Sequence, residues 1–176
     1  MAIVGCNLPN RFIEQHDIFF GVAPTLADLK PKLIEFWPEI AEKLHIDSYR
    51  IVSKVGNHRI SVVDAAEKKD NGLHLYFLNL GGYKPDDMEE YHYKQLIVAS
   101  SMAEAIRIGK KNVFWQHYTE PHIDNKYGID VDDAYMVEDM LPADVRNQYG
   151  IQIEEDVENS REDELHIGYL KLSKLQ

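Results

Sequence analysis

The sequence predicts an α+β fold made of two tandem ββαββ-like repeats, in which helices cover one face of a largely antiparallel sheet. Three observations predict it: short β-rich runs along the chain, two helical stretches that interrupt them, and matching segments that recur in the same order. We expect repeat 1 to span residues 1–72 and repeat 2 to span residues 73–156, related by a pseudo-two-fold axis. Units of about seventy residues are marginal alone, so the repeats should share a core or pair their sheets edge to edge.

The matching segments lie at a nearly constant spacing, which is 76 positions for the first two pairs and differs slightly for the others. The pairs, written first copy and then second, are Glu14-Gln15-His16 and Glu90-Tyr91-His92, Val22-Ala23 and Val98-Ala99, His45-Ile46-Asp47 and His122-Ile123-Asp124, and Leu8-Pro9-Asn10 and Leu80-Gly81-Gly82. The matches keep their order and include both polar and apolar positions. They therefore indicate that one unit occurs twice.

In repeat 1, apolar and β-branched residues predict strands over residues 2–8 and 16–23. Apolar residues then recur at helical spacing over residues 26–40 and predict a helix with one apolar face, which Pro38 should end. Pro31 lacks a backbone donor, so this helix should either kink there or begin near Lys30.

Two further strands complete repeat 1, over residues 49–55 and His58–Asp64. Gly56-Asn57 lies between them and is a typical tight-hairpin signal. The two strands should therefore pair as a hairpin.

Repeat 2 follows the same order. Strands are predicted over residues 73–80 and 92–99, and a helix begins at the capping box formed by Ser101 and Glu104. The last strands are expected over residues 134–138 and 150–155, with a short helical turn at residues 142–146 in place of the tight hairpin turn.

Composition excludes several classes of function. The net charge is −11, from 30 acidic against 19 basic residues, and such a surface repels phosphate backbones, so we expect no nucleic-acid partner. No apolar run has the length of a bilayer span, and no signal-peptide pattern is present, so we expect no membrane partner. The single cysteine, Cys6, cannot form an internal disulfide, which favours a cytoplasmic location.

Residues 157–176 are interpreted as an acidic linker followed by a C-terminal strand. Seven of the eleven residues over 154–164 are acidic, and charge repulsion at this density predicts a solvated segment. Residues 165–172 alternate between apolar and polar types, as a strand does. We expect this strand to join the sheet of its own chain or that of a neighbouring subunit.

Pairs of a carboxylate and an imidazole recur at a spacing of two residues, which places both side chains on the same face of a strand. If the His-Ile-Asp segments fold over the second strand, each repeat gathers two imidazoles and two carboxylates. This ligand set suits a divalent transition metal such as Zn²⁺ or Fe²⁺, with an open position for water. The candidate ligands are Glu14, His16, His45 and Asp47 in repeat 1, and Glu90, His92, His122 and Asp124 in repeat 2. In the alternative interpretation these residues form structural hydrogen bonds and the protein holds no cofactor.

Four features carry a resemblance to a known family: Ile13-Glu14-Gln15-His16-Asp17, Leu44-His45-Ile46-Asp47, Gly81-Gly82 and the final hairpin. Together they resemble the domain-of-unknown-function 1543 family of bacterial proteins. The resemblance covers residues 7–64 clearly and 79–155 more loosely. It implies a bacterial origin and a duplicated fold, and it carries no biochemical function.

Three functions stay open at this stage. The first is a non-enzymatic binding or assembly scaffold whose strand edges recruit another protein or a second copy of the chain, giving a homo-oligomer such as a dimer. The second is a metal-dependent hydrolase that uses the Glu/His and His/Asp pairs. The third is a small-molecule sensor with a pocket between the repeats. The absence of any recognised catalytic motif favours the first.

Overall fold

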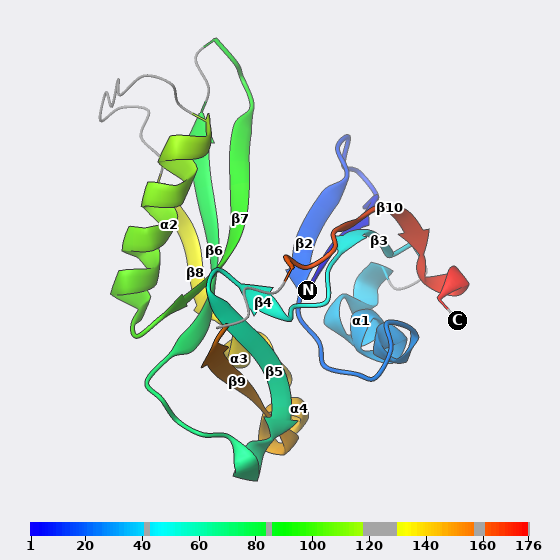
Figure 1. The fold of residues 1–176 in the computed structure, drawn as a ribbon. Coiled ribbons are helices and arrows are strands. Elements are labelled where there is room, and N and C mark those ends of the chain that lie inside the picture. The colour runs from blue at the N-terminus through cyan, green and yellow to red at the C-terminus, as the bar shows by residue number, and fades with distance from the viewer. Residues whose placement is uncertain (41–42, 84–85, 118–129, 157–160, 176) are drawn as a thin grey trace. The chain divides into compact units, whose positions relative to one another are not determined.

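The computed structural model describes residues 1–40, 43–83, 86–117, 130–156 and 161–175 (Figure 1). The chain forms two compact units. Unit 1 combines Met1–Ser53 with Ser160–Gln176, and unit 2 is the continuous segment Lys54–Asn159. Every strand pair among the described residues is antiparallel, and helices lie between strands along the chain, so the predicted α+β class is confirmed.

Unit 1 contains a four-stranded sheet with the strand order β10-β3-β1-β2. The central strand β1 (Ala2–Cys6) pairs with β2 (Gln15–Phe19) and with β3 (His45–Tyr49). The C-terminal strand β10 (His166–Lys171) pairs with the outer edge of β3. The terminal strand predicted from the alternating residues therefore joins the sheet of its own chain.

A short helix covers one face of this sheet. The turn η1 (Ala27–Leu29) leads into α1 (Lys30–Phe36) and then η2 (Pro38–Ile40). Pro31 stands in the first turn of α1, where its missing N–H breaks no helical hydrogen bond, so the helix begins at Lys30 and does not kink at the proline. The buried cluster between helix and sheet includes Val4, Cys6, Leu33 and Ile46, together with Leu172 from the final turn η4 (Leu172–Lys174).

Unit 2 contains a three-stranded sheet with the order β7-β6-β8. Its strands are β6 (His74–Tyr83), β7 (Glu90–Ala99) and β8 (Asp130–Met136). The helix α2 (Met102–His117) packs against all three, over a buried cluster that includes Leu78, Leu80 and Ile97.

A second small sheet in unit 2 has the order β4-β5-β9. Its strands are β4 (Lys54–Val55), β5 (His58–Asp64) and β9 (Tyr149–Glu155), and the helical segments beside it are η3 (Ala65–Glu67), α3 (Val137–Met140) and α4 (Ala143–Gln148). Gly56 has a φ of 58° in the predicted hairpin turn between β4 and β5. β5 pairs with β9 over seven residues, so the last strands of the two predicted repeats lie edge to edge.

The two larger sheets share one connectivity. In each, the first strand along the chain is flanked by the second and third, and a helix lies between the second and third strands. The bounds of the predicted repeats, 1–72 and 73–156, differ from those of the compact units. The reason is that β4 and β5, from the first predicted repeat, belong to unit 2, where β5 pairs with β9. The tandem duplication itself stays a prediction that the shared connectivity favours.

Two predicted strands have other bounds. The strand predicted over residues 49–55 is confirmed only at its last two residues, which form β4, because β3 begins at His45 and ends at Tyr49. The strand predicted over residues 134–138 begins earlier as β8, and Val137 opens the helix α3. In the first case, pairing with strands on both sides outweighs the low β-propensity of a segment that contains Asp and Ser.

The interpretation of residues 154–164 as a solvated linker is wrong at two described positions. The side chain of Asp156 is fully buried and its carboxylate lies 3.3 Å from the buried Nζ of Lys54. The Asp163 carboxylate, only 3% exposed, lies 2.7 Å from the guanidinium of Arg50. Each carboxylate forms an ion pair with a basic side chain that is distant in sequence. The local density of acidic residues cannot predict such a pair. No described helix has both the length and the apolar character needed to cross a membrane.

Candidate metal centre

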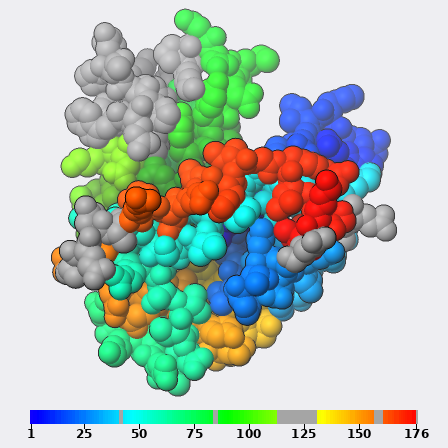
Figure 2. All heavy atoms as spheres, turned by 45° about the vertical axis from the view of Figure 1, so that its right-hand side comes forward, coloured from blue at the N-terminus to red at the C-terminus, as the bar shows by residue number. Residues whose placement is uncertain are grey.

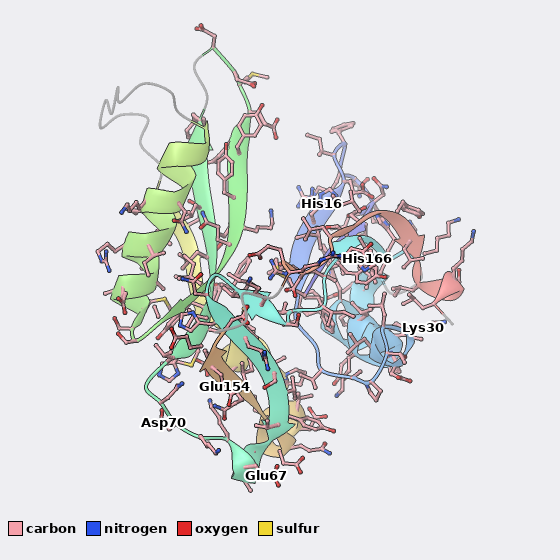
Figure 3. All side chains as sticks on the ribbon, viewed as in Figure 1. His16, Lys30, Glu67, Asp70, Glu154 and His166 are labelled. Atoms are coloured by element: carbon pink, nitrogen blue, oxygen red, sulfur yellow. The ribbon has the colours of Figure 1, made fainter. Side chains whose placement is uncertain are left out.

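The sheet of unit 1 brings together the four candidate ligands of repeat 1. In the strand register, Gly5 of β1 lies opposite His16 on β2 and opposite His45 on β3. Residues directly opposite in antiparallel strands share a face, so both imidazoles flank Gly5 on the face away from the buried cluster. His16 is labelled on β2 in Figure 3.

A β-bulge brings a carboxylate to the same face. The register of β1 and β3 shifts between Ile3 and Val4, which pair with Ser48 and Ile46, so Asp47 is the extra residue. Asp47 lies two positions after His45 and therefore projects to the same side. Glu14 reaches this side from the residue just before β2.

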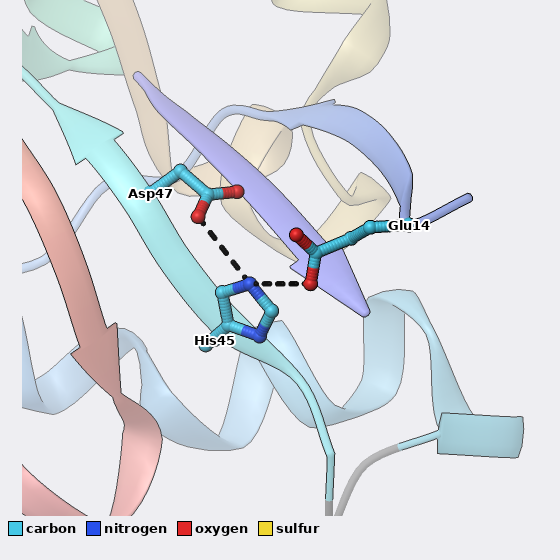
Figure 4. Close-up of side chains that lie close together, drawn as sticks. All are labelled: Glu14, His45 and Asp47. Carbon is cyan, nitrogen blue, oxygen red and sulfur yellow. Dashed lines mark ion pairs between the residues drawn. The ribbon is translucent and has the colours of Figure 1, made fainter. Parts of the chain in front are cut away.

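The four side chains form a closed set of short contacts. His45 Nε2 lies 3.1 Å from Glu14 Oε1 and 3.3 Å from Asp47 Oδ1 (Figure 4). His16 Nε2 lies 3.3 Å from Asp47 Oδ2 and 3.6 Å from Glu14 Oε2. Each carboxylate therefore stands between the two imidazoles.

The orientation of the His45 ring leaves one nitrogen without a hydrogen bond. Nδ1 lies 3.3 Å from the carbonyl oxygen of Lys43, which is the acceptor for an Nδ1–H donor. In that tautomer Nε2 carries a lone pair, and it points toward two carboxylate groups. His45 is only 3% exposed, and both His45 Nε2 and Asp47 Oδ2 are buried without a hydrogen-bond partner. Buried polar atoms of this kind require an explanation.

Gly5 leaves the space in which these atoms converge. A Cβ at this position would lie 2.6 Å from Asp47 Oδ2 and 2.8 Å from His45 Nε2. No side chain fits there without moving the ligand atoms. The observed arrangement of the four side chains therefore requires glycine at residue 5.

Two neighbours support the cluster. The Asn7 side-chain amide donates to Glu14 Oε1 at 3.2 Å and orients that carboxylate. The ring of Tyr169 on β10 lies 4.3 Å from the His45 ring, centroid to centroid, and covers it. The side chains of Glu14, His16 and Asp47 are 32%, 43% and 29% exposed, so solvent reaches one side of the cluster.

The candidates of repeat 2 are brought together only in part. His92 Nδ1 lies 3.1 Å from the carboxylate of Asp132, a residue that the sequence interpretation did not include. The Glu90 carboxylate accepts a hydrogen bond from Tyr83, which raises the pKa of that phenol. His122 and Asp124 lie outside the described residues.

Sequence interpretation missed Gly5 and Asp132, although one signal points to Gly5. The spacing of 76 positions that joins His16 to His92 also joins Gly5 to Gly81. The strand register aligns these two glycines, whereas the sequence matches had aligned Gly81 with Pro9. No comparable signal reveals Asp132, because a bulge in the strand pairing determines its position.

A cavity of about 530 Å³ adjoins the cluster at His45 and Asn7. The residues that line it include Lys30, Lys43 and Lys171, and none of its described lining residues is acidic. In a chain of net charge −11 this is a local concentration of positive charge.

Comparisons with known proteins agree with this fold. No curated protein matches the chain. A solved structure, described as the crystal structure of a protein Il1583 from Idiomarina loihiensis, is 24% identical with a TM-score of 0.66, over 97% of this chain and 94% of that chain. This likeness shows a shared fold. Residues 11–62 match the family described as Domain of Unknown Function (DUF1543), which confirms the predicted resemblance over a segment that contains Glu14, His16, His45 and Asp47.

Proposed function

We propose that unit 1 binds a divalent transition metal ion between Glu14, His16, His45 and Asp47. The observation that carries this proposal is the buried Nε2 of His45, which faces two carboxylate oxygens at 3.1 and 3.3 Å without a hydrogen bond. A lone pair so close to two negative groups is repelled unless a proton or a metal ion lies between them. A metal ion removes the repulsion and uses all three groups.

The spacing of the donor atoms fits a bound metal ion. Zinc bonds of about 2.0–2.1 Å in tetrahedral geometry place neighbouring donor atoms about 3.4 Å apart. The nitrogen–oxygen separations in the cluster are 3.1 to 3.6 Å. One atom each of Glu14, His45 and Asp47 lies within 4.8 Å of the others.

The surroundings of His45 are typical of a metal ligand. Metal-bound histidines commonly donate their second ring N–H to a carboxylate or a backbone carbonyl, which fixes the tautomer. The Lys43 carbonyl is placed to accept this bond, and the Tyr169 ring restricts the movement of the imidazole.

If an ion binds here, the activity to test is that of the metal-dependent hydrolase predicted from the sequence. The partial exposure of His16 leaves room for water in the coordination sphere. A bound divalent ion lowers the pKa of such a water, which generates a nucleophile near neutral pH. The lysine-lined cavity beside His45 supports an anionic substrate or ligand bound within unit 1, whereas the sequence predicted a small-molecule pocket between the repeats.

The direct test is metal binding by untagged protein that has been stripped with a chelator and dialysed. We expect one equivalent of Zn²⁺ to bind to unit 1, and Co²⁺ to give the visible absorption of a low-symmetry site. His45→Ala and Asp47→Asn should each weaken binding by at least about 100-fold, as loss of a ligand exceeds the 10–100-fold effect of outer-shell changes.

The matched control is His58→Ala, which removes an imidazole outside the cluster and should leave the affinity unchanged. If folded wild-type protein binds neither ion, or if His45→Ala binds both ions as tightly as wild type, the proposal is wrong.

Anion binding is tested separately with inorganic phosphate, comparing Lys43→Ala with Lys174→Ala, since Lys174 lies outside the cavity lining.

Assembly of a second copy through the edge strand β10 is the second candidate. Among described residues β10 forms one edge of its sheet, and the exposed fractions of Leu165, Ile167 and Tyr169 are 61%, 82% and 61%. The C-terminal segment lies at the surface (Figure 2). An exposed apolar edge favours strand pairing in a homodimer, consistent with the scaffold predicted from the sequence. Ile167→Lys should then convert a dimer to a monomer in light scattering, and a wild-type monomer at high concentration would exclude this assembly.

A further inference from the structure

Unit 2 repeats the local arrangement of the cluster at positions displaced by 76 residues. Gly81 of β6 lies opposite His92 on β7, as Gly5 lies opposite His16. The register shift also recurs, between Asn79 and Leu80 in unit 2.

The bulge in unit 2 places Asp132 where unit 1 has Asp47. Asn79 pairs with Asp133 and Leu80 pairs with Val131, so Asp132 is the extra residue of β8. Its Oδ2 lies 3.1 Å from Nδ1 of His92. The structural counterpart of Asp47 is therefore Asp132, and not Asp124 as the sequence matches had indicated.

The requirement for a glycine on the central strand also recurs in unit 2. A Cβ at Gly81 would lie 2.5 Å from Asp132 Oδ2 and 2.7 Å from Oδ1. A side chain at this position would displace the carboxylate, as it would at Gly5. In both sheets the central strand thus leaves open the space between an imidazole and a bulged aspartate.

In each unit the corresponding glutamate accepts a hydrogen bond from a neighbouring side chain. In unit 1 the Asn7 amide donates to Glu14, and in unit 2 the Tyr83 hydroxyl donates to Glu90. Both pairs obey the spacing of 76 positions. Four positions, those of Gly5, Asn7, Glu14 and His16, therefore correspond at one spacing, and Asp132 matches Asp47 in the strand register at a longer one, which also favours the predicted duplication.

Among the described side chains, the arrangement in unit 2 contains one imidazole, that of His92, whereas the cluster of unit 1 contains two. The side-chain amide nitrogen of Asn79 lies 3.5 Å from Nδ1 of His92, and its buried Oδ1 has no hydrogen-bond partner. Oxygen-rich sites prefer harder cations than sites with two imidazoles do.

We propose that unit 2 carries a second divalent-cation site, centred on His92 and Asp132 beside the Asn79 side-chain amide, whose donor types suit Mn²⁺. The side chains of His92 and Asp132 are 42% and 33% exposed, so the ion can enter from solvent. This site does not depend on the cluster of unit 1, because its ligands come from β6, β7 and β8 alone.

The test is Mn²⁺ binding, followed by the loss of the electron paramagnetic resonance signal of free Mn²⁺. The protein carries His45→Ala and Asp47→Asn, which disable the unit 1 cluster. We expect one equivalent of Mn²⁺ to remain bound, and we expect Asp132→Asn in this background to weaken binding at least tenfold. Asp139→Asn, a 68% exposed carboxylate elsewhere in unit 2, is the control and should have no effect.

Asp132→Asn preserves the size of the side chain, and circular dichroism with thermal melting verifies that each variant is folded. If the folded background protein binds no Mn²⁺, or if Asp132→Asn binds it as tightly as the control, the unit 2 site does not exist. Zinc binding by the single variant Asp132→Asn reports on unit 1 alone, so failure of the two proposals is distinguishable.

Discussion

The carboxylate of Asp163 and the guanidinium of Arg50 form a 2.7 Å ion pair that connects residues 113 positions apart in the sequence. The same carboxylate accepts hydrogen bonds from the backbone N–H and the hydroxyl of Ser53. These contacts lie directly before β10 in the sequence and hold the returning C-terminal segment against the end of the N-terminal segment of unit 1.

Asp163→Ala should destabilise unit 1. It removes the Asp163 carboxylate from a partly buried guanidinium and from the backbone N–H of Ser53, and breaking a buried pair in this way costs about 3 kcal/mol. Urea denaturation monitored by fluorescence measures the loss. Glu164→Ala, an exposed neighbour of the same charge, is the control and should change the free energy of unfolding by less than about 0.5 kcal/mol.

The buried pair of Lys54 and Asp156 gives a second stability prediction, in unit 2. Asp156→Ala leaves the Lys54 ammonium buried without this carboxylate, and we expect a loss of about 3–5 kcal/mol. Replacing both residues, as Lys54→Met with Asp156→Leu, should recover most of that loss because neither charge remains. A double variant that is no more stable than Asp156→Ala in chemical denaturation would contradict this account.

Gly5→Ala should disrupt the cluster of unit 1. The added methyl group would lie within 2.8 Å of Asp47 Oδ2 and His45 Nε2, so we expect Zn²⁺ affinity to fall and stability to drop by about 1–3 kcal/mol from overpacking. Isothermal titration calorimetry and thermal melting measure the two effects. Gly81→Ala is the matched change in unit 2 and should leave Zn²⁺ binding by unit 1 intact. Equal effects of both changes on Zn²⁺ affinity would argue against separate sites.

The thiol of Cys6 should be a reporter of unfolding. Burial raises its pKa, the Glu14 carboxylate raises it further and Lys43 opposes the shift, so little reactive thiolate is present near neutral pH. The side chain is 0% exposed. We expect alkylation in native buffer to be at least about 100-fold slower than in concentrated urea. Fast labelling of the native protein would mean that β1 opens readily.

The i, i+2 spacing of carboxylates and imidazoles was sufficient to predict that Glu14 and His16 share a face, as do His45 and Asp47, because that periodicity is a local property of strands. The sequence also predicted the hairpin at Gly56 and the return of the C-terminal strand. In each case the residues themselves carry the signal.

The β-bulges and the buried carboxylates could not be predicted from the sequence. Asp47 and Asp132 point into their clusters because one residue is extra in a ladder between distant strands, and no local pattern encodes that register. Asp156 and Asp163 belong to the densest acidic segment, yet each meets a cation far away in the chain. Tertiary partners, and not local charge, decide whether such groups are solvated.

The placement of β10 in the sheet of unit 1 has a consequence for biosynthesis. Unit 2 is one uninterrupted stretch, whereas unit 1 joins the beginning of the chain to its last residues. Domains fold as they leave the ribosome. Unit 2 can therefore fold while translation continues, but β3 keeps an open edge until the residues of β10 have been translated and have emerged. The nascent chain is most exposed to chaperones and to aggregation at that N-terminal edge.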